Sequence, residues 1–212
     1  QQGYNTIVWH GVTLRDHALQ LTSDSQIGFD DAWQQVQAQL QPKAFIQSLL
    51  AIDHADQLSA QQYRELPGLL PKGLQKVQLN LSSVPASLVQ AVQQWHQQQP
   101  SLQVVLNVTH ALNDEDRVRL KTLLSILTQT DASDQAVWQG WVQVPLSQIQ
   151  TMKSVVSAPY LVAAMPTKLS TQTDQQYLSC YPKADVMGMS LPLNQVDDTS
   201  AVKSRVFLPT AD

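Results

Sequence analysis

Residues 76–127 constrain the fold more than any other part of this chain, because they read as strand, helix, strand and helix in succession. Apolar and polar residues alternate over 76–82, and Val and Leu dominate 102–109; both patterns are typical of β-strands. One apolar stripe at helical spacing follows Pro85, and a second follows Asn113, where three acidic residues mark a helix start. Two strands joined by a helix form a βαβ unit, which is almost always parallel and right-handed. The stretch therefore predicts an α/β fold.

Four amide side chains interrupt the apolar pattern of these two strands: Gln78, Asn80, Gln103 and Asn107. Strands of an open, doubly wound sheet are buried on both faces and are expected to be apolar throughout. One interpretation of the amides is that the strands lie at an edge or in a half-exposed sheet. The other is that they face a barrel interior, where the amides hydrogen-bond to one another or line a site.

The alternation of strands and helices extends over most of the chain. Strands are predicted at residues 6–14, 139–144, 160–165 and 184–190, and helices at 31–40, 146–156 and from Ser59 to an end at Pro67 and Gly68. The nearly continuous apolar run at 44–52 also fits a strand, but periodicity alone does not exclude a helix there. The predicted fold class is α/β with alternating β-α units, forming either an incomplete or modified barrel-like sheet or a doubly wound sheet. We expect a single α/β domain over residues 1–193 and a polar tail or linker over 194–212.

Composition limits the possible partners and compartments. Charged residues are only 14% of the 212, the net charge is −4, and the polar surface is glutamine-rich. Without a basic stripe, the sequence argues against nucleic acid as a partner. The longest apolar run, 160–165, is too short for a transmembrane segment. We expect a soluble protein, cytoplasmic or periplasmic, since the single Cys180 fits either compartment, and the start at Gln1 fits a piece of a larger bacterial protein.

Candidate site residues stand where the predicted strands end, because ligands of parallel α/β folds gather at the carboxyl ends of strands. The ligand-binding candidates are Asp53, His54, Asn80, Asn107 and His110. Asp53, His54 and Asp56 place two carboxylates beside an imidazole, which suits a divalent metal or an oriented base but is more often found in a solvated, helix-capping turn. His110 with Asp114 is open to the same two interpretations, an acid–base pair or a cap cluster. No metal site, cofactor or catalytic residue is assigned.

Motifs that identify common enzyme classes are absent from the sequence: GxGxxG, GxxxxGK[ST], HExxH, GxSxG and CxxC. Catalysis stays open, since a barrel can assemble a site from single residues far apart in the chain. The pattern nevertheless favours a domain that is not an enzyme.

Two short segments resemble motifs of a known family. LNLS at Leu79–Ser82 and LNVTH at Leu106–His110 resemble the NLS and ExTE segments of bacterial EAL domains, which are barrels that bind or hydrolyse cyclic di-GMP. The resemblance implies that Asn80 matches the family's metal-binding Asn and that Asn107 and His110 replace its two glutamates. The EAL triplet, the DDFG-type aspartates and the catalytic Lys motif are not visible, so the resemblance implies a degenerate barrel that senses the nucleotide.

The sequence thus predicts a non-catalytic α/β binding or assembly domain of a larger bacterial protein. Its expected partner is another protein or the rest of a larger chain, and a small-molecule ligand is a further option. Two alternatives remain. One is the degenerate EAL-like barrel that senses a cyclic dinucleotide. The other is a barrel-type hydrolase that uses strand-end carboxylates and histidines, chiefly Asp53, His54 and His110.

Overall fold

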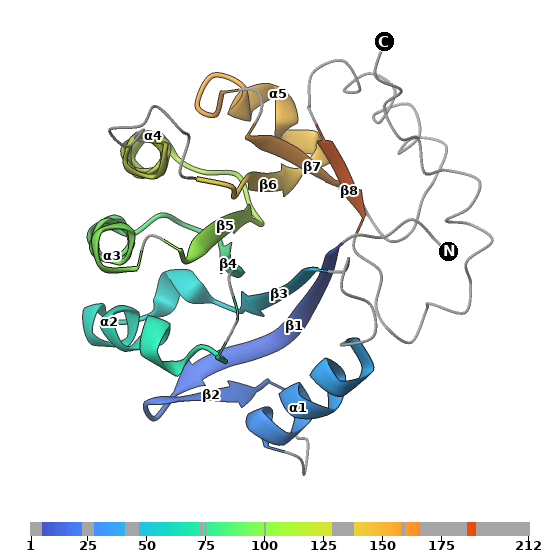
Figure 1. Cartoon of the computed structure of the whole chain (residues 1–212). Helices are drawn as coiled ribbons and strands as arrows, with labels where there is room; N and C mark the ends of the chain where they lie inside the picture. The colour runs from blue at the N-terminus through green and yellow to red at the C-terminus, as the bar shows by residue number, and fades with distance from the viewer. Residues whose placement is uncertain are drawn as a thin grey trace, which may run out of the picture. The chain divides into compact units, whose positions relative to one another are not determined.

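The computed structural model confirms the α/β class (Figure 1). It describes residues 6–22, 28–40, 47–72, 74, 76–99, 101–128, 138–157, 160–165 and 186–189. The chain divides into two compact units, Gln1–Val142 and Gln143–Asp212, which we call unit 1 and unit 2. The predicted tail 194–212 lies outside the described residues.

Unit 1 is built on a mostly parallel sheet. Its strands are β1 (Thr6–Arg15), β2 (Ala18–Leu21), β3 (Gln47–Ile52), β4 (Lys76–Leu81) and β5 (Gln103–Val108). They lie side by side in the order β2-β1-β3-β4-β5, and only β2 runs antiparallel to its neighbour. β4 and β5 pair in parallel from Lys76↔Gln103 to Leu81↔Val108, as the βαβ pattern predicts.

The helices of unit 1 cover one face of this sheet (Figure 1). They are α1 (Phe29–Leu40), α2 (Ala60–Leu69), α3 (Ala86–Gln98) and α4 (Asp114–Leu127). Strands β1, β3, β4 and β5 are added in one direction, and right-handed crossovers then place every helix on the same side. A doubly wound sheet reverses direction and is covered on both faces. Unit 1 therefore adds its parallel strands in the order expected for the barrel-like alternative, although its described strands do not close into a barrel.

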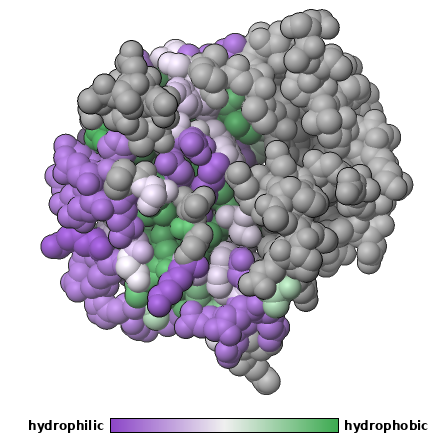
Figure 2. Space-filling model, viewed as in Figure 1, coloured by the Kyte–Doolittle hydropathy of each residue, from purple (hydrophilic) through white to green (hydrophobic). Residues whose placement is uncertain are grey.

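Apolar side chains fill the layer between sheet and helices. Fully buried members come from the strands and from the helix stripes that the sequence predicts: Leu50, Ile52, Leu79, Leu81, Leu106, Leu88, Val92, Leu120 and Leu123. Each such side chain contributes roughly 1.5–3 kcal/mol of transfer free energy. Hydrophilic side chains cover the outer surfaces of α2 and α3 (Figure 2). The amphipathic stripes thus explain why these helices lie against the sheet.

Two local features of unit 1 differ from the predicted pattern, one a wrong helix end and the other a strand that the pattern does not predict. Helix α2 does not end at Pro67 but continues to Leu69. Pro67 has no N–H for the Tyr63 carbonyl one turn earlier, and the Trp95 indole of α3 donates to that carbonyl instead, at 3.0 Å. Strand β2 was not expected at all, since its two-residue hairpin turn uses Asp16 and His17 at φ 46° and 61°. Glycine usually marks such a turn, and here it is missing.

Unit 2 is described over fewer residues. Strands β7 (Leu161–Met165) and β8 (Val186–Met189) pair in parallel from Val162↔Val186 to Met165↔Met189. The helix expected over 146–156 is shorter: a 3₁₀ turn at Leu146–Gln148 leads into α5 (Ile149–Met152). The Ser154 hydroxyl donates to the Thr151 carbonyl at 2.9 Å, a local bond that competes with helix continuation.

Strand β6 (Val142–Pro145) begins later than expected and spans the division between the units. Within unit 1, the segment that precedes it runs beside β5, where the Leu106 N–H donates to the Trp141 carbonyl at 3.0 Å. No helix in the described parts of the chain is long and apolar enough to cross a membrane.

Candidate functional site

A hydrogen-bond network joins the carboxyl ends of β3, β4 and β5 on the sheet face opposite the helices. We call this surface the amide face; it consists of Asp53, Gln78, Asn80 and Asn107. The Asn80 amide nitrogen donates to Asp53 Oδ1 at 2.7 Å. The amide nitrogens of Gln78 and Asn107 each donate to Asn80 Oδ1 at 2.8 Å. Every bond therefore runs toward the Asp53 carboxylate.

Strand register explains why these side chains meet. Asn80 stands directly opposite Asn107, and Gln78 lies two residues earlier on the same face. Asp53 follows β3, whose Ala51 is the partner of Gln78. The network is thus a consequence of parallel pairing without any offset between β4 and β5.

A bulge in β1 adds a backbone donor to the network. Trp9 pairs with Leu50 and Val12 with Ile52, so two residues of β1, His10 and Gly11, stand opposite one residue of β3. Gly11 has φ 82°, a conformation that glycine adopts easily, and its N–H donates to Asp53 Oδ2 at 3.1 Å. The bulge therefore aims a backbone N–H at the carboxylate.

Three of the four amides, Gln78, Asn80 and Asn107, bond to one another, as one of the two interpretations of the sequence predicts. The fourth, Gln103, instead accepts from the Gln139 N–H through Oε1 at 2.8 Å. Gln78 is only 1% exposed, and a buried amide needs hydrogen-bond partners. Strand β4 is no edge strand, since β3 and β5 flank it. Asp53, Asn80 and Asn107 are half-buried and remain within reach of solvent.

Two histidines lie next to this network in sequence. Exclusion of water by neighbouring protein atoms lowers the pKa of His10, while the nearby Asp53 carboxylate acts in the opposite direction. His54 is exposed and has φ 53° at the start of the 3₁₀ helix Ala55–Gln57, with no side-chain cap hydrogen bond. This left-handed conformation is strained for a residue other than glycine.

The remaining candidate residues have other partners. Asp56 Oδ2 accepts from the hydroxyls of Ser82 at 2.6 Å and Ser83 at 3.2 Å, so Asp56 and Asp53 have separate sets of donors. His110 Nδ1 pairs with the Thr109 hydroxyl at 2.8 Å, and Asp114 pairs with Arg117 at 3.3 Å.

The structure thus joins three of the five predicted site residues, Asp53, Asn80 and Asn107, in one network. His54 and His110 form no hydrogen bond to it among the described residues. In the same part of the chain, no group of three or more His, Cys, Asp and Glu could hold a metal ion.

Helix α4 holds the loop that carries Ser82 and Ser83. The Val84 N–H donates to Asp116 Oδ1 at 3.0 Å, and Arg119 donates to the Val84 carbonyl at 3.4 Å. Asp116 is 5% exposed, and its own N–H donates to the side chain of the helix cap Asn113. The predicted helix start at Asn113 is therefore confirmed, and it also positions Asp116.

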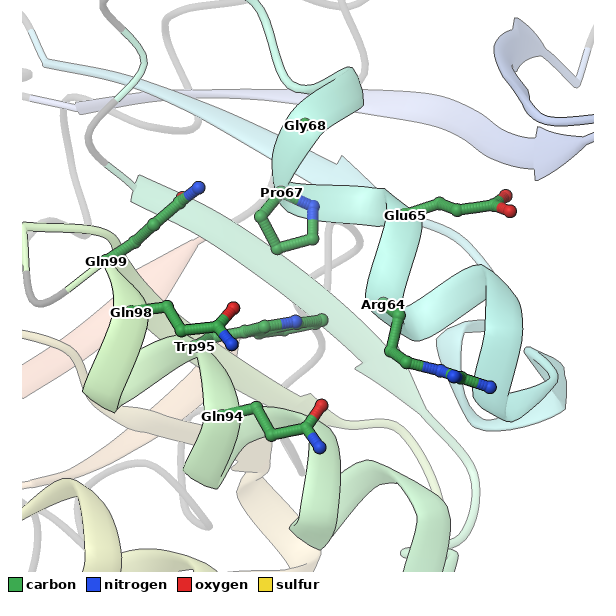
Figure 3. Close-up of a pocket in the computed structure, with 8 residues that line it drawn as sticks. All are labelled: Arg64, Glu65, Pro67, Gly68, Gln94, Trp95, Gln98 and Gln99. Atoms are coloured by element: carbon green, nitrogen blue, oxygen red, sulfur yellow. The ribbon is translucent and has the colours of Figure 1, made fainter.

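A separate groove of about 560 Å³ lies on the helix side of the sheet, between α2 and α3 (Figure 3). Its lining comes from both helices and from the residue that follows α3: Arg64, Glu65, Pro67, Gly68, Gln94, Trp95, Gln98 and Gln99. Because the helices cover the opposite side of the sheet, this groove takes no part in the amide face.

Sequence reasoning did not include two residues of the network among the site candidates. Gly11 interrupts the first predicted strand, and an isolated glycine in a strand is a signal for a bulge. Gln78 precedes Asn80 by two residues, which places both amides on one face of the strand. Both signals were present, but neither says which partner the residue meets.

Protein-family models, characterised proteins and solved structures contain no match to this chain.

Proposed function

We propose that this chain is a non-catalytic binding or assembly domain that uses the amide face. One observation carries the proposal: Asp53 is held by two neutral donors, at 2.7 and 3.1 Å, and the rest of the network points toward it. A carboxylate oriented by fixed amide donors is suited to accept hydrogen bonds from a ligand.

The proposed partner is another protein or the rest of a larger bacterial chain. Only 14% of the residues are charged, so electrostatic steering is expected to contribute little to the rate of association. The rate of association should then change little with salt concentration.

The direct test asks whether Asp53 supports turnover. The purified chain and an Asp53→Asn variant are assayed with a nitrophenyl phosphodiester and with nitrophenyl glycosides, with and without Mg²⁺ and Mn²⁺. We expect the same background rate for both proteins. If the parent chain shows turnover that Asp53→Asn lacks, the proposal is overturned. Loss of the same turnover in His54→Ala and in His110→Ala would support the hydrolase alternative.

A second candidate is a degenerate barrel that senses a cyclic dinucleotide. It is favoured by one observation: Asn80 and Asn107, which carry the resemblance to EAL domains, stand opposite each other and share a 2.8 Å hydrogen bond. Calorimetry with cyclic di-GMP, with and without Mg²⁺, tests this candidate. Binding by the parent chain that is lost in Asn80→Ala would support it, and no binding by the parent would end it.

A further inference from the structure

The Asp53 carboxylate forms no ion pair with the described Lys, Arg or His side chains. Its hydrogen bonds come from neutral donors, the Gly11 N–H and the Asn80 amide. The ion pairs in the described parts of the chain involve other acids: Glu65, Asp114, Glu115 and Asp116. His10 is close to the carboxylate, and burial lowers the pKa of its ring, which disfavours its charged form. A half-buried charge without a counter-ion favours the approach of a cation.

The amide face also has unused acceptors. A carboxylate can accept about four hydrogen bonds, and the described residues donate two to Asp53. Asn80 Oδ1 already accepts two, from Gln78 and Asn107. Asn107 donates through its nitrogen, and its own carbonyl oxygen accepts no hydrogen bond from the residues that the structure describes. The network therefore offers a carboxylate and an amide carbonyl on one face, both at half-buried positions.

We propose that the amide face binds a guanidinium or primary ammonium group, with Asp53 as the counter-ion and the Asn107 carbonyl as a second acceptor. Charge-assisted N–H donors form the strongest hydrogen bonds with carboxylates, and a planar guanidinium can address a carboxylate with two parallel bonds. The group belongs either to an Arg or Lys side chain of a protein partner or to a free small molecule. A phosphate group would face the Asp53 charge with no cation of the network to offset it.

This inference rests on the proposed function, because it names the ligand of the same face. It is tested by titrating the whole ¹⁵N-labelled chain with Nα-acetylarginine amide and Nα-acetyllysine amide, with acetylcitrulline amide as the uncharged match to arginine. The reporters are the Gly11 backbone amide and the side-chain amides of Asn80 and Asn107. We expect saturable shifts at these reporters with at least one cation and none with citrulline.

Matched variants separate the named carboxylate from general attraction to an acidic protein. Asp53→Asn should weaken binding by roughly tenfold or more, since it removes a charged hydrogen-bond acceptor. Asp56→Asn neutralises the neighbouring carboxylate, which is bound to Ser82 and Ser83, and should bind like the parent. If Asp53→Asn loses the dispersed spectrum of a folded chain, Asn107→Ala replaces it and should weaken binding several-fold.

The source of the cation is distinguished by comparing agmatine with a Gly-Arg-Gly peptide blocked at both ends. Tighter binding of the peptide identifies a partner's side chain, and tighter binding of agmatine identifies a free small molecule. Equal response to citrulline, retention of binding in Asp53→Asn, or no saturable shift with either cation would overturn the inference. If cyclic di-GMP shifts the same reporters and neither cation does, the binding function is supported but the cation is the wrong ligand. Turnover that depends on Asp53 would instead overturn the proposed function itself.

Discussion

At the scale of single residues, Gly140 controls how the chain passes β5. A Cβ atom on Gly140 would lie 2.0 Å from the Val104 carbonyl oxygen and 2.3 Å from the Trp138 indole nitrogen. These two atoms are hydrogen-bonded to each other at 2.8 Å in a buried position. Any side chain at this position must therefore displace either the backbone of β5 or the indole.

We expect Gly140→Ala to lower the free energy of unfolding by about 2 kcal/mol or more, since it breaks a buried hydrogen bond and shifts backbone. Urea unfolding measures the change. Gly68→Ala is the control, because no atom lies within 4 Å of its added Cβ and alanine favours the helix. Equal stabilities of the two variants would contradict the close approach at Gly140.

Asp116 is the second residue whose role can be isolated. It accepts the Val84 N–H in a buried position, so Asp116→Ala leaves that donor without its partner. We expect a loss of about 1–3 kcal/mol in unfolding free energy. Asp114→Ala removes an acidic group from the same helix turn, where the side chain is 96% exposed, and should cost less than about 0.5 kcal/mol. A similar loss in both variants would mean that the charge at the helix start matters more than the hydrogen bond.

At the scale of elements, α2 and α3 are joined by a bond that Pro67 makes possible. The Tyr63 carbonyl has no helical N–H to accept, and the Trp95 indole donates to it at 3.0 Å. Tyr63 is itself fully buried and donates to the Ala55 carbonyl, and burial raises the pKa of its hydroxyl.

Trp95→Phe should therefore cost about 1–3 kcal/mol, because it leaves the Tyr63 carbonyl unsatisfied in addition to changing the packing. In a Pro67→Ala background, the new backbone N–H can donate to the same carbonyl, and the cost of Trp95→Phe should fall. A double-mutant cycle by chemical denaturation measures this coupling. Additive effects of the two substitutions would show that the bond contributes nothing to stability.

The β1–β2 hairpin is tied to α2 by an exposed pair, His17 Nδ1 and Glu65 Oε2, at 2.7 Å. The hydrogen bond that Glu65 accepts raises the pKa of His17 above its ordinary 6.5, and the same bond lowers the pKa of Glu65 below its ordinary 4.5. The His17 contribution to stability is full below pH 6.5 and is lost as pH rises through its raised pKa. The Glu65 contribution is full above pH 4.5 and is lost as pH falls through its lowered pKa.

We expect Glu65→Gln to bring the pKa of His17 back toward 6.5, because its main hydrogen-bond acceptor loses its charge. An NMR titration of the His17 ring protons measures the shift. Unchanged titration of His17 in the variant would mean that the pair does not form in solution.

At the scale of the whole molecule, protection should be uneven across unit 1. Strand β4 has hydrogen-bonded neighbours on both sides and fully buried side chains at Val77, Leu79 and Leu81. Strand β2 is four residues long and lies at the end of the strand order. Stability is distributed in the same way in proteins generally, with the core strands opening last.

Amide hydrogen exchange tests this gradient. We expect the amides of β4 and β5 to exchange only when unit 1 unfolds as a whole, and those of β2 to exchange through local opening at lower free energy. Urea dependence of the exchange rates separates the two routes. Exchange of β2 with the same urea dependence as β4 would show that unit 1 opens as one cooperative block.

Sequence alone determined the α/β class, the βαβ unit over residues 76–127 and the apolar faces of its helices. These features follow from local periodicity, which survives in any packing that buries the apolar stripes. The alternation also placed Gln78 and Asn80 on one face of their strand. Asp53 was a candidate because it follows a strand, a position that can be read without knowing its neighbours.

Tertiary structure decided what those residues meet. Asp53 and Asn80 are 27 positions apart in the chain, and their hydrogen bond depends on the register between β3 and β4. Register is a property of the pairing rather than of either strand. The donor from Gly11 depends on a bulge that exists only because β1 lies beside β3. The continuation of α2 past Pro67 depends likewise on an indole supplied by another helix. Local patterns determine which faces of the strands are apolar and which carry amides. The amides and Asp53 form one network only through long-range hydrogen bonds, which a periodic pattern does not encode.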